Sequence, residues 1–357
     1  ARDEWVYDAS AENLKRKVKY LIDTYNQNVD NRVNKNYSTC QPLSPNSSIK
    51  WSRAVKKDLL KGNKYSFSFN YIRDSLYRPF VKQKLYFSKD LNEMQYQLGQ
   101  IFINNDTQNL LIGFSDPASP KPFMVLATNK IPDYHLVGDS QCLSLYCYDK
   151  EGNRIDNITD WGLAKFQNHY RNVLYNVSII TKLDIFHYIY AVLHYPSYLQ
   201  KYEINLKRQF PRLPFYDNFY QWVSWGKQLM DLHINYETVA PYPLKRIDLP
   251  VGDDGRRKFK PTKAKLKADK DKGRIILDTV TTLEGIPEIA WEYQLGDRSA
   301  LEWILDRYKE KKPKDPTIAE KFNTYRFADY KEQAIDLLQR VCTVSVETMR
   351  IIGEMEG

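Results

Sequence analysis

The hydrophobic pattern changes once along the chain, from short strand-like runs to long helical repeats, and this change most constrains the fold. Between residues 65 and 148, apolar runs of strand length are divided by turns rich in Asn, Asp, Gly and Pro. Between residues 160 and 236, apolar residues recur at helical spacing, and Pro196 should begin a new helix there. Because strands and helices do not alternate regularly, we predict an α+β fold with a mixed, mostly antiparallel sheet lobe and a helical lobe.

The two ends of the chain also carry helical patterns. Residues 10–25 form an amphipathic repeat with Asp8 or Ser10 as a candidate N-cap. The Asn-, Ser- and Pro-rich residues 26–48 indicate a loop, and a short basic helix follows. After residue 274 the pattern predicts strands, then a short helix and a closing amphipathic helix.

Cationic residues alternate with aromatic rings in residues 71–100. Guanidinium groups pair with phosphate or guanine, and rings pack on sugars or displaced bases, so this mixture favours nucleic acid as the ligand. On a half-buried strand, however, core rings also alternate with solvated cations. Both interpretations remain open for this stretch.

The overall composition agrees with an acidic partner. The chain has 357 residues, with 53 Lys and Arg against 44 Asp and Glu, and a formal net charge of +9. Its four cysteines show no Cys-x-x-Cys pair, which indicates neither a zinc ribbon nor a disulfide framework and favours a reducing, cytoplasmic setting. The sequence has no signal-peptide pattern and no apolar run near the ~20 residues of a membrane span. It begins with Ala-Arg-Asp-Glu-Trp rather than Met, so we expect a piece of a longer polypeptide.

Residues 255–274 hold ten Lys or Arg against two Asp. Such a charge run is typical of a solvated loop, and a DNA-contacting arm is the alternative.

Motifs for catalysis are missing from the sequence. It contains no GxGxxG, GxxxxGK[ST], HExxH or GxSxG pattern, and its five histidines do not fall at metal-ligand spacing. Asp133 and His135 could orient a general base, but a turn Asp beside a hydrogen-bonded His is the simpler interpretation. His187 and His194 share a helical face and are typical of interior histidines. We therefore predict no catalytic residue and no metal site in this chain.

Several segments, taken in order, resemble the C-terminal specificity (target recognition) domain of Type ISP restriction-modification enzymes. The most extensive are SLYRPFVKQKLYF at 75–87, IPDYHLVGDSQCLSLYCYD at 131–149, DIFHYIYAVLHYPSYLQKYEINLKRQFPRLPF at 184–215 and TLEGIPEIAWEYQLGDRSALEWILDRY at 282–308. The resemblance extends over nearly the whole chain. The lysine-rich residues 255–274 have no counterpart in it.

The resemblance implies a target-recognition fold that binds double-stranded DNA for a bacterial defence enzyme. In that family a nuclease, an ATP-driven helicase-type translocase and an adenine N6-methyltransferase precede this domain. S-adenosylmethionine, ATP and Mg²⁺ would then serve the upstream modules, with no cofactor in this chain. The expected organisation is a connector helix to the methyltransferase in 1–35, a sheet-rich recognition lobe in 36–159, a helical subdomain in 160–247, and a basic loop, strand pair and C-terminal helices in 248–357.

Ten residues are candidate DNA contacts. Cationic side chains suit the phosphate backbone, and loop Gln and Asn suit adenine edges. Arg78 could instead pair with a carboxylate and Asn92 could cap a turn. The predicted backbone contacts are Arg73, Arg78, Lys82, Lys84, Lys207 and Arg208, and the predicted base or groove contacts are Tyr86, Asn92, Ser140 and Gln141.

Two other functions compete with DNA recognition. A protein-interaction or scaffold module would dock the methyltransferase and translocase domains without reading bases, and its association would not depend on salt. An enzyme with unrecognised motifs would turn over substrate with Mg²⁺ or S-adenosylmethionine.

Overall fold

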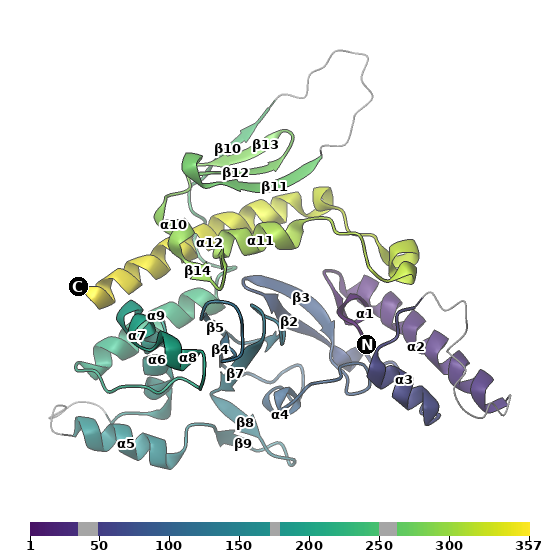
Figure 1. Ribbon diagram of the computed structural model, residues 1–357, viewed down its shortest axis with the longest axis horizontal. Helices are drawn as coiled ribbons and strands as arrows, with labels where there is room; N and C mark the ends of the chain where they lie inside the picture. Colours follow the sequence, from purple (N-terminus) through teal and green to yellow (C-terminus); the bar gives the residue numbers. More distant parts are fainter. Residues whose placement is uncertain (35–48, 172–178, 250–262) are drawn as a thin grey trace. The chain divides into compact units, whose positions relative to one another are not determined.

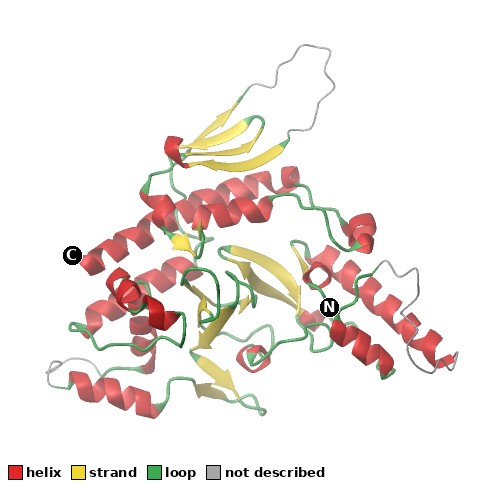
Figure 2. Ribbon diagram, in the orientation of Figure 1, coloured by secondary structure: helices red, strands yellow, loops and turns green. Residues whose placement is uncertain are grey.

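The computed structural model describes residues 1–34, 49–171, 179–249 and 263–357. The chain folds into two compact units, each assembled from separate stretches of sequence (Figure 1). The first unit holds residues 1–75, 82–107 and 311–325, and the second holds residues 76–81, 108–310 and 326–357. Helices and small, mostly antiparallel sheets are both present (Figure 2), which confirms the predicted α+β class. The four segments predicted above follow the order of the chain, whereas each unit combines stretches from several of them.

The first unit is built around the long helix α2 (Ala11–Asn34). Its apolar face buries Leu14, Val18 and Leu21, as the helical spacing predicts. The backbone N–H of Asn13 donates to Ser10 Oγ at 3.3 Å, so Ser10 caps the helix. The other elements of this unit are α1 (Asp3–Val6), β1 (Tyr7–Asp8), α3 (Arg53–Leu60), η1 (Phe69–Tyr71), α4 (Leu98–Ile101) and η3 (Ile318–Phe322).

Helix α2 continues past the predicted end near Tyr25, so the predicted loop at 26–48 is wrong for its first part. The reason is a contact with a distant segment. Tyr25 stacks on Tyr65 with ring centroids 4.1 Å apart, and the Asn26 side chain accepts from Tyr65 N at 3.0 Å and donates to Tyr65 O at 2.9 Å. Because these bonds satisfy Asn26, the helix need not end at that residue. Residues 35–48 of the predicted loop lie outside the described residues.

A buried lysine also stabilises the first unit. Lys17 pairs with Asp8 at 2.8 Å and donates to the carbonyl oxygens of Glu4 and Tyr7 at 2.9 and 2.6 Å. Burial lowers the pKa of Lys17, and Asp8 opposes that shift. The ammonium group is therefore fully hydrogen-bonded, as a buried charge must be.

The second unit contains a three-stranded antiparallel sheet in the order β5-β4-β7. Its central strand β4 (Leu111–Ser115) is buried along its whole length between β5 (Val125–Thr128) and β7 (Ser140–Ser144). Helices α6 (Lys182–Val192) and α9 (Phe219–Ile234) pack on each other and α9 packs on β5 (Figures 1 and 2). The smaller elements here are β6 (Ile131–Pro132), β8 (Tyr146–Tyr148), β9 (Arg154–Asp156), α5 (Asp160–Tyr170), α7 (Pro196–Lys201) and α8 (Glu203–Leu206). Pro196 starts α7, which confirms that prediction.

The C-terminal part of the second unit adds a four-stranded sheet and two packed helices. The sheet runs β10 (Lys245–Asp248), β13 (Thr281–Glu284), β12 (Arg274–Asp278), β11 (Ala264–Asp269). Helix α12 (Phe327–Glu356) lies along α11 (Ala300–Tyr308), as Figure 1 shows. The remaining elements are η2 (Lys270–Lys272), α10 (Ile289–Glu292), β14 (Gln294–Leu295) and β15 (Arg298–Ser299).

The basic segment 255–274 differs from the predicted solvated loop. Residues up to 262 lie outside the described residues, but 264–269 form strand β11 and pair with β12. Leu266 is buried in the apolar core of the second unit together with Ile275 of β12. One buried leucine therefore holds a strand whose other residues are mostly cations and small residues.

The core of the second unit encloses a chain of buried polar groups. Ala127 N–H donates to Tyr190 Oη at 2.7 Å, and Tyr190 Oη lies 2.5 Å from His233 Nδ1. His233 Nε2 lies 2.9 Å from Thr348 Oγ1, so both ring nitrogens of His233 have a hydrogen-bond partner. His194 Nδ1 donates to the Tyr190 carbonyl at 2.8 Å, while its Nε2 is buried without a partner. Both histidines are thus interior and neutral, as predicted for His194.

Replacing Gly226 with Ala should strongly destabilise the second unit. A Cβ at Gly226 would lie 1.8 Å from the carbonyl oxygen of His187, so α6 and α9 would have to separate. We expect a loss of about 3 kcal/mol or more in the free energy of unfolding, the upper end for overpacking. Chemical denaturation measures this loss. The matched control is Gly353→Ala in α12, where nothing lies within 4 Å, and which should gain up to about 1 kcal/mol. Equal stability of the two variants would contradict the packing described.

The buried histidines should make stability depend on pH below neutrality. Burial lowers the pKa of His194 to about 4 and that of His233 well below its usual value of 6.5. The unfolded chain therefore binds more protons, so stability is complete above pH 6.5 and falls as the pH drops toward 4. Each histidine contributes at most ~1.4 kcal/mol per pH unit.

His194→Leu should reduce this slope relative to the wild type in urea denaturation measured from pH 7 to pH 5. A variant slope equal to that of the wild type would show that His194 is already protonated in the folded chain or exposed to water.

Candidate nucleic-acid interface

The tip of one hairpin places the predicted contact Arg78 in the second unit. Strands β2 (Ile72–Arg78) and β3 (Val81–Tyr86) meet at Pro79 and Phe80, and residues 76–81 belong to the second unit. Phe80 is buried and packs edge-on against Tyr236, with centroids 5.2 Å apart. Arg78 lies over the ring of Tyr77 at 4.1 Å. Burial of Phe80 therefore fixes the position of the Tyr77–Arg78 pair.

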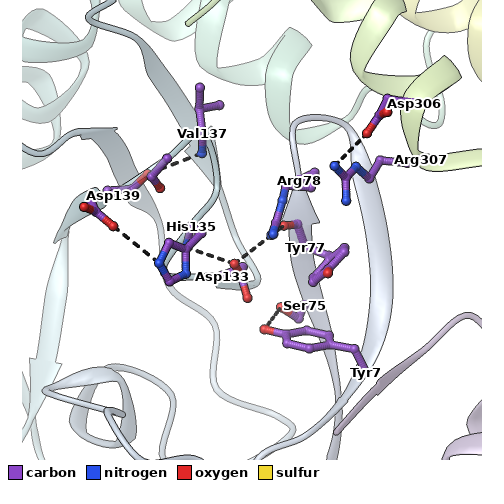
Figure 3. A network of polar contacts seen from close by, with 12 residues as sticks. Tyr7, Ser75, Tyr77, Arg78, Asp133, His135, Val137, Asp139, Asp306 and Arg307 are labelled. Atoms are coloured by element: carbon purple, nitrogen blue, oxygen red, sulfur yellow. Dashed lines mark hydrogen bonds and ion pairs between the residues drawn. The ribbon is translucent and has the colours of Figure 1, made fainter. Parts of the chain in front are cut away.

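The loop between β6 and β7 contacts this tip (Figure 3). Arg78 Nη1 lies 2.7 Å from Asp133 Oδ1, and the Asp133 N–H donates to the Leu76 carbonyl at 3.0 Å. Asp133 Oδ1 also accepts from His135 N at 2.9 Å. Arg78 is therefore held by a carboxylate, the structural alternative raised from the sequence. Asp133 acts as its partner and as a turn residue, and His135 lies 3.3 Å from Asp139.

Two further arginines of the second unit, Arg298 and Arg307, are connected to this pair through shared rings and carboxylates. Arg307 of α11 lies 5.9 Å from the Tyr77 ring, and Figure 3 shows it beside Arg78. Arg298 of β15 lies 5.1 Å from the Trp303 ring. Burial lowers the pKa of Arg307, and the charge of Arg78 lowers it further. We call this group the arginine cluster: Arg78, Arg298 and Arg307, with the rings of Tyr77 and Trp303 and the carboxylates of Asp133 and Asp306.

A pocket of about 420 Å³ lies elsewhere in the second unit, between the β4–β5 loop and helices α7 and α8. Lys207 lines it and pairs with Glu203 at 2.5 Å. Asp116 also lines it and accepts from the Gln141 amide at 2.5 Å. Charges of both signs thus meet at this pocket. The predicted residue Lys207 therefore lines the pocket, and the predicted residue Gln141 is connected to it through Asp116.

Two more predicted residues of the second unit differ in how firmly they are held. Ser140 Oγ accepts from Val137 N at 3.4 Å and donates to Gly138 O at 3.3 Å, which closes the β6–β7 loop. Arg208 is exposed, and its side chain has no hydrogen-bond or ion-pair partner in the described part of the chain. Arg208 is the predicted cation that the fold constrains least.

The predicted residues of the first unit are mostly engaged within the protein. Arg73 donates to the carbonyl oxygens of Phe102 and Ile103 at 2.6 and 3.3 Å, and burial lowers its pKa. Lys84 pairs with Asp74 at 2.6 Å on the surface. Asn92 Oδ1 accepts from Ser88 N at 2.8 Å, the capping role left open from the sequence.

The remaining two residues of that unit differ in exposure. Lys82 is half-buried and interacts with another residue of the chain. Tyr86 has 0% exposure, and its hydroxyl oxygen accepts from Ser68 N at 3.0 Å. The groove contact by Tyr86 stays a prediction, and it would require the ring to leave the core in which it is buried.

The sequence reasoning missed Arg298 and Arg307. Trp303 and Arg307 lie four residues apart and so share one face of α11, and Arg298 stands just before that helix. The sequence signal for this site was an arginine one helical turn after a tryptophan. Residues 298–308 contain two acidic and two basic residues, so their net charge does not indicate a binding site for an anion.

Two features are missing from the residues that the structure describes. No helix among them has the length and apolarity that a membrane crossing requires. No group of three or more His, Cys, Asp or Glu side chains among them could hold a metal ion.

Comparison with known proteins gives consistent matches over the chain. The family model described as the Type ISP C-terminal specificity domain matches residues 1–337. A solved DrdV–DNA complex matches 99% of the chain at 48% identity with a TM-score of 0.89. The Type ISP enzymes LlaGI, in complex with a DNA substrate mimic, and LlaBIII, bound to DNA, also match 99% of the chain, at 31% and 27% identity and TM-scores of 0.81 and 0.78.

The matched region makes up 35%, 32% and 22% of the DrdV, LlaGI and LlaBIII chains, so this chain spans about a third or less of their length. No curated protein matched the sequence.

The Arg78–Asp133 pair should contribute measurably to stability. Their side chains are only 13% and 8% exposed, and Asp133 also accepts from His135 N. We expect Asp133→Asn to lower the free energy of unfolding by about 1.5–3 kcal/mol, the range for hydrogen bonds to charged groups. Thermal or urea denaturation checks this value. Asp297→Asn, which breaks the exposed pair with Lys121, should change stability little. Similar effects of both substitutions would mean that the Arg78 pair is no stronger than a surface contact.

Proposed function

The chain belongs to the Type ISP C-terminal specificity domain family, and from this premise we propose that it recognises a specific sequence in double-stranded DNA. The observation that carries the proposal is the match of 99% of the chain, at 48% identity, to a protein solved as a complex with DNA. The net charge of +9 and the arginine cluster support the same ligand, because DNA carries a negative charge at every phosphate.

In this proposal, cations supply affinity and loop side chains supply selectivity. Arg208 and Lys84 are exposed or half-exposed, and they can reach phosphates with little rearrangement. Ser140 and Gln141 begin β7 and follow the loop that Asp133 holds. The Gln141 amide would exchange its bond with Asp116 for the edge of an adenine, and a bidentate base contact contributes about 1–3 kcal/mol of discrimination.

We propose that this chain selects the site and carries no catalytic centre of its own. Methylation of adenine N6, ATP-driven translocation and cleavage would belong to other modules of a longer parent enzyme. S-adenosylmethionine, ATP and Mg²⁺ would bind those modules, and the whole enzyme would act in the cytoplasm. This division agrees with the small share of the DrdV, LlaGI and LlaBIII chains that the present chain spans.

Selection from randomised duplex DNA tests the proposal. The full chain of 357 residues should enrich one asymmetric motif, and its affinity should fall with salt with a log–log slope of about −0.9 per phosphate contact. A scrambled duplex of equal length and composition is the control, and it should bind more weakly with a similar dependence on salt.

Retention of DNA without an enriched motif would contradict sequence recognition and leave a nonspecific DNA-binding module. Absence of DNA binding at any salt concentration would instead favour the scaffold function, in which the chain docks protein domains only.

A further inference from the structure

We propose that the arginine cluster is a binding site for a single phosphodiester, with Arg298 and Arg307 as its main ligands. The inference rests on the proposed function and deepens it by naming two residues and one chemical group. The site lies wholly within the second unit.

The charges of the cluster do not balance. Three guanidinium groups face two carboxylates, Asp133 with Arg78 and Asp306 shared by Arg298 and Arg307. Asp297, which precedes Arg298 in the chain, is already paired with Lys121. Among the residues that the structure describes, one positive charge of the cluster therefore has no paired carboxylate, although Arg307 is only 20% exposed. Uncompensated charge in a half-buried position is costly unless an anion binds there.

The hydrogen bonds of the cluster are also incomplete. A guanidinium group has five N–H donors, but Arg307 makes one hydrogen bond within the described residues, from Nη2 to Asp306 at 2.7 Å. Its Nε–H is buried and has no partner. Arg298 approaches Asp306 only at 3.3 Å and is 40% exposed. Donors are thus available from two arginines, one of them accessible from solvent.

The guanidinium groups of Arg298 and Arg307 lie within cation–π distance of aromatic rings. Arg307 lies 5.9 Å from the rings of both Tyr77 and Trp303, and Arg298 lies 5.1 Å from Trp303. Guanidinium groups that stack on rings keep their edges open for planar, bidentate contacts. A tetrahedral oxyanion can accept two parallel N–H bonds from such an edge.

The single excess positive charge of the arginine cluster favours an anion with one negative charge. A phosphodiester carries one negative charge and would neutralise the cluster, whereas a nucleoside triphosphate would reverse its sign. The half-buried position favours an anion that extends from a polymer backbone over a small, strongly hydrated dianion. The phosphate of a DNA strand fits both conditions.

The experiment measures binding of the full chain to a duplex that contains its selected motif, across a range of salt concentrations. Arg298→Gln and Arg307→Gln should each reduce the salt slope by about 0.9, the value for one phosphate contact. Both should weaken motif and scrambled duplexes by the same factor, because a phosphate contact carries no sequence information. Arg350→Gln is the matched control, since Arg350 is an exposed arginine paired with Glu347 and Glu354, and it should leave binding unchanged.

A set of duplexes that each carry one neutral methylphosphonate locates the contact. One position should weaken binding by the wild type but not by Arg298→Gln or Arg307→Gln. If Arg307→Gln unfolds, Arg307→Lys keeps the charge and removes the planar edge, so it should weaken binding while preserving most of the salt slope. Thermal unfolding of every variant separates lost contacts from lost structure.

The outcomes distinguish failure of the phosphate site from failure of DNA recognition, the proposed function on which that site rests. If the wild type binds its motif but Arg298→Gln and Arg307→Gln behave like Arg350→Gln, the phosphate site is overturned and DNA recognition stands. If the wild type binds no DNA, both proposals are overturned.

Discussion

The insertion of Phe80 into the core of the second unit is the contact on which the rest of the interface depends. Phe80 follows Pro79 at the hairpin turn and has a φ of 57°, a left-handed conformation that Gly or Asn usually adopts. Burial of its ring against Tyr236 and near His233 compensates for that strain. The hairpin therefore has one conformation at its tip. Because the tip is fixed, Tyr77 and Arg78 meet Asp133 and Arg307 at defined distances.

The buried histidine chain supports the same contact from within. His233 stacks on Tyr293, lies near Phe80, and forms hydrogen bonds with Tyr190 and Thr348. Such a network specifies one arrangement of helices because a displaced member would leave a buried polar group unpaired. Phe80 therefore connects the ordered core to the hairpin tip that carries Tyr77 and Arg78. Arg73, Arg78 and Arg307 are each held by protein oxygens, and within the described residues Arg73 and Arg307 each also keep a buried Nε–H that has no partner.

The sequence predicted the features that depend on local pattern. It predicted the α+β class, the helix that begins at Pro196, an N-cap at Asp8 or Ser10, and the interior position of His194. It failed where distant contacts decide the outcome. The length of α2 depends on the bonds between Asn26 and Tyr65, and β11 depends on the burial of Leu266.

At the candidate site too, the sequence failed where contacts between distant residues decide the outcome. Alternation of rings and cations in residues 71–100 could not separate the core ring of Tyr86 from the half-exposed ring of Tyr77. Arg298 and Arg307 join Arg78 only in the folded chain, more than two hundred residues later in the sequence. Residue types therefore indicated nucleic acid as the ligand, whereas the interaction partners of each cation could be identified only from the tertiary structure.

The central claim is that this chain chooses the DNA sequence on which a parent enzyme acts. Exchange of this chain for the matching 35% of DrdV, followed by selection of the motif that the chimaera binds in randomised duplex DNA, tests that claim most directly. The account predicts that the chimaera selects the same motif as the isolated chain. A folded chimaera that still selects the motif of unmodified DrdV would contradict the account.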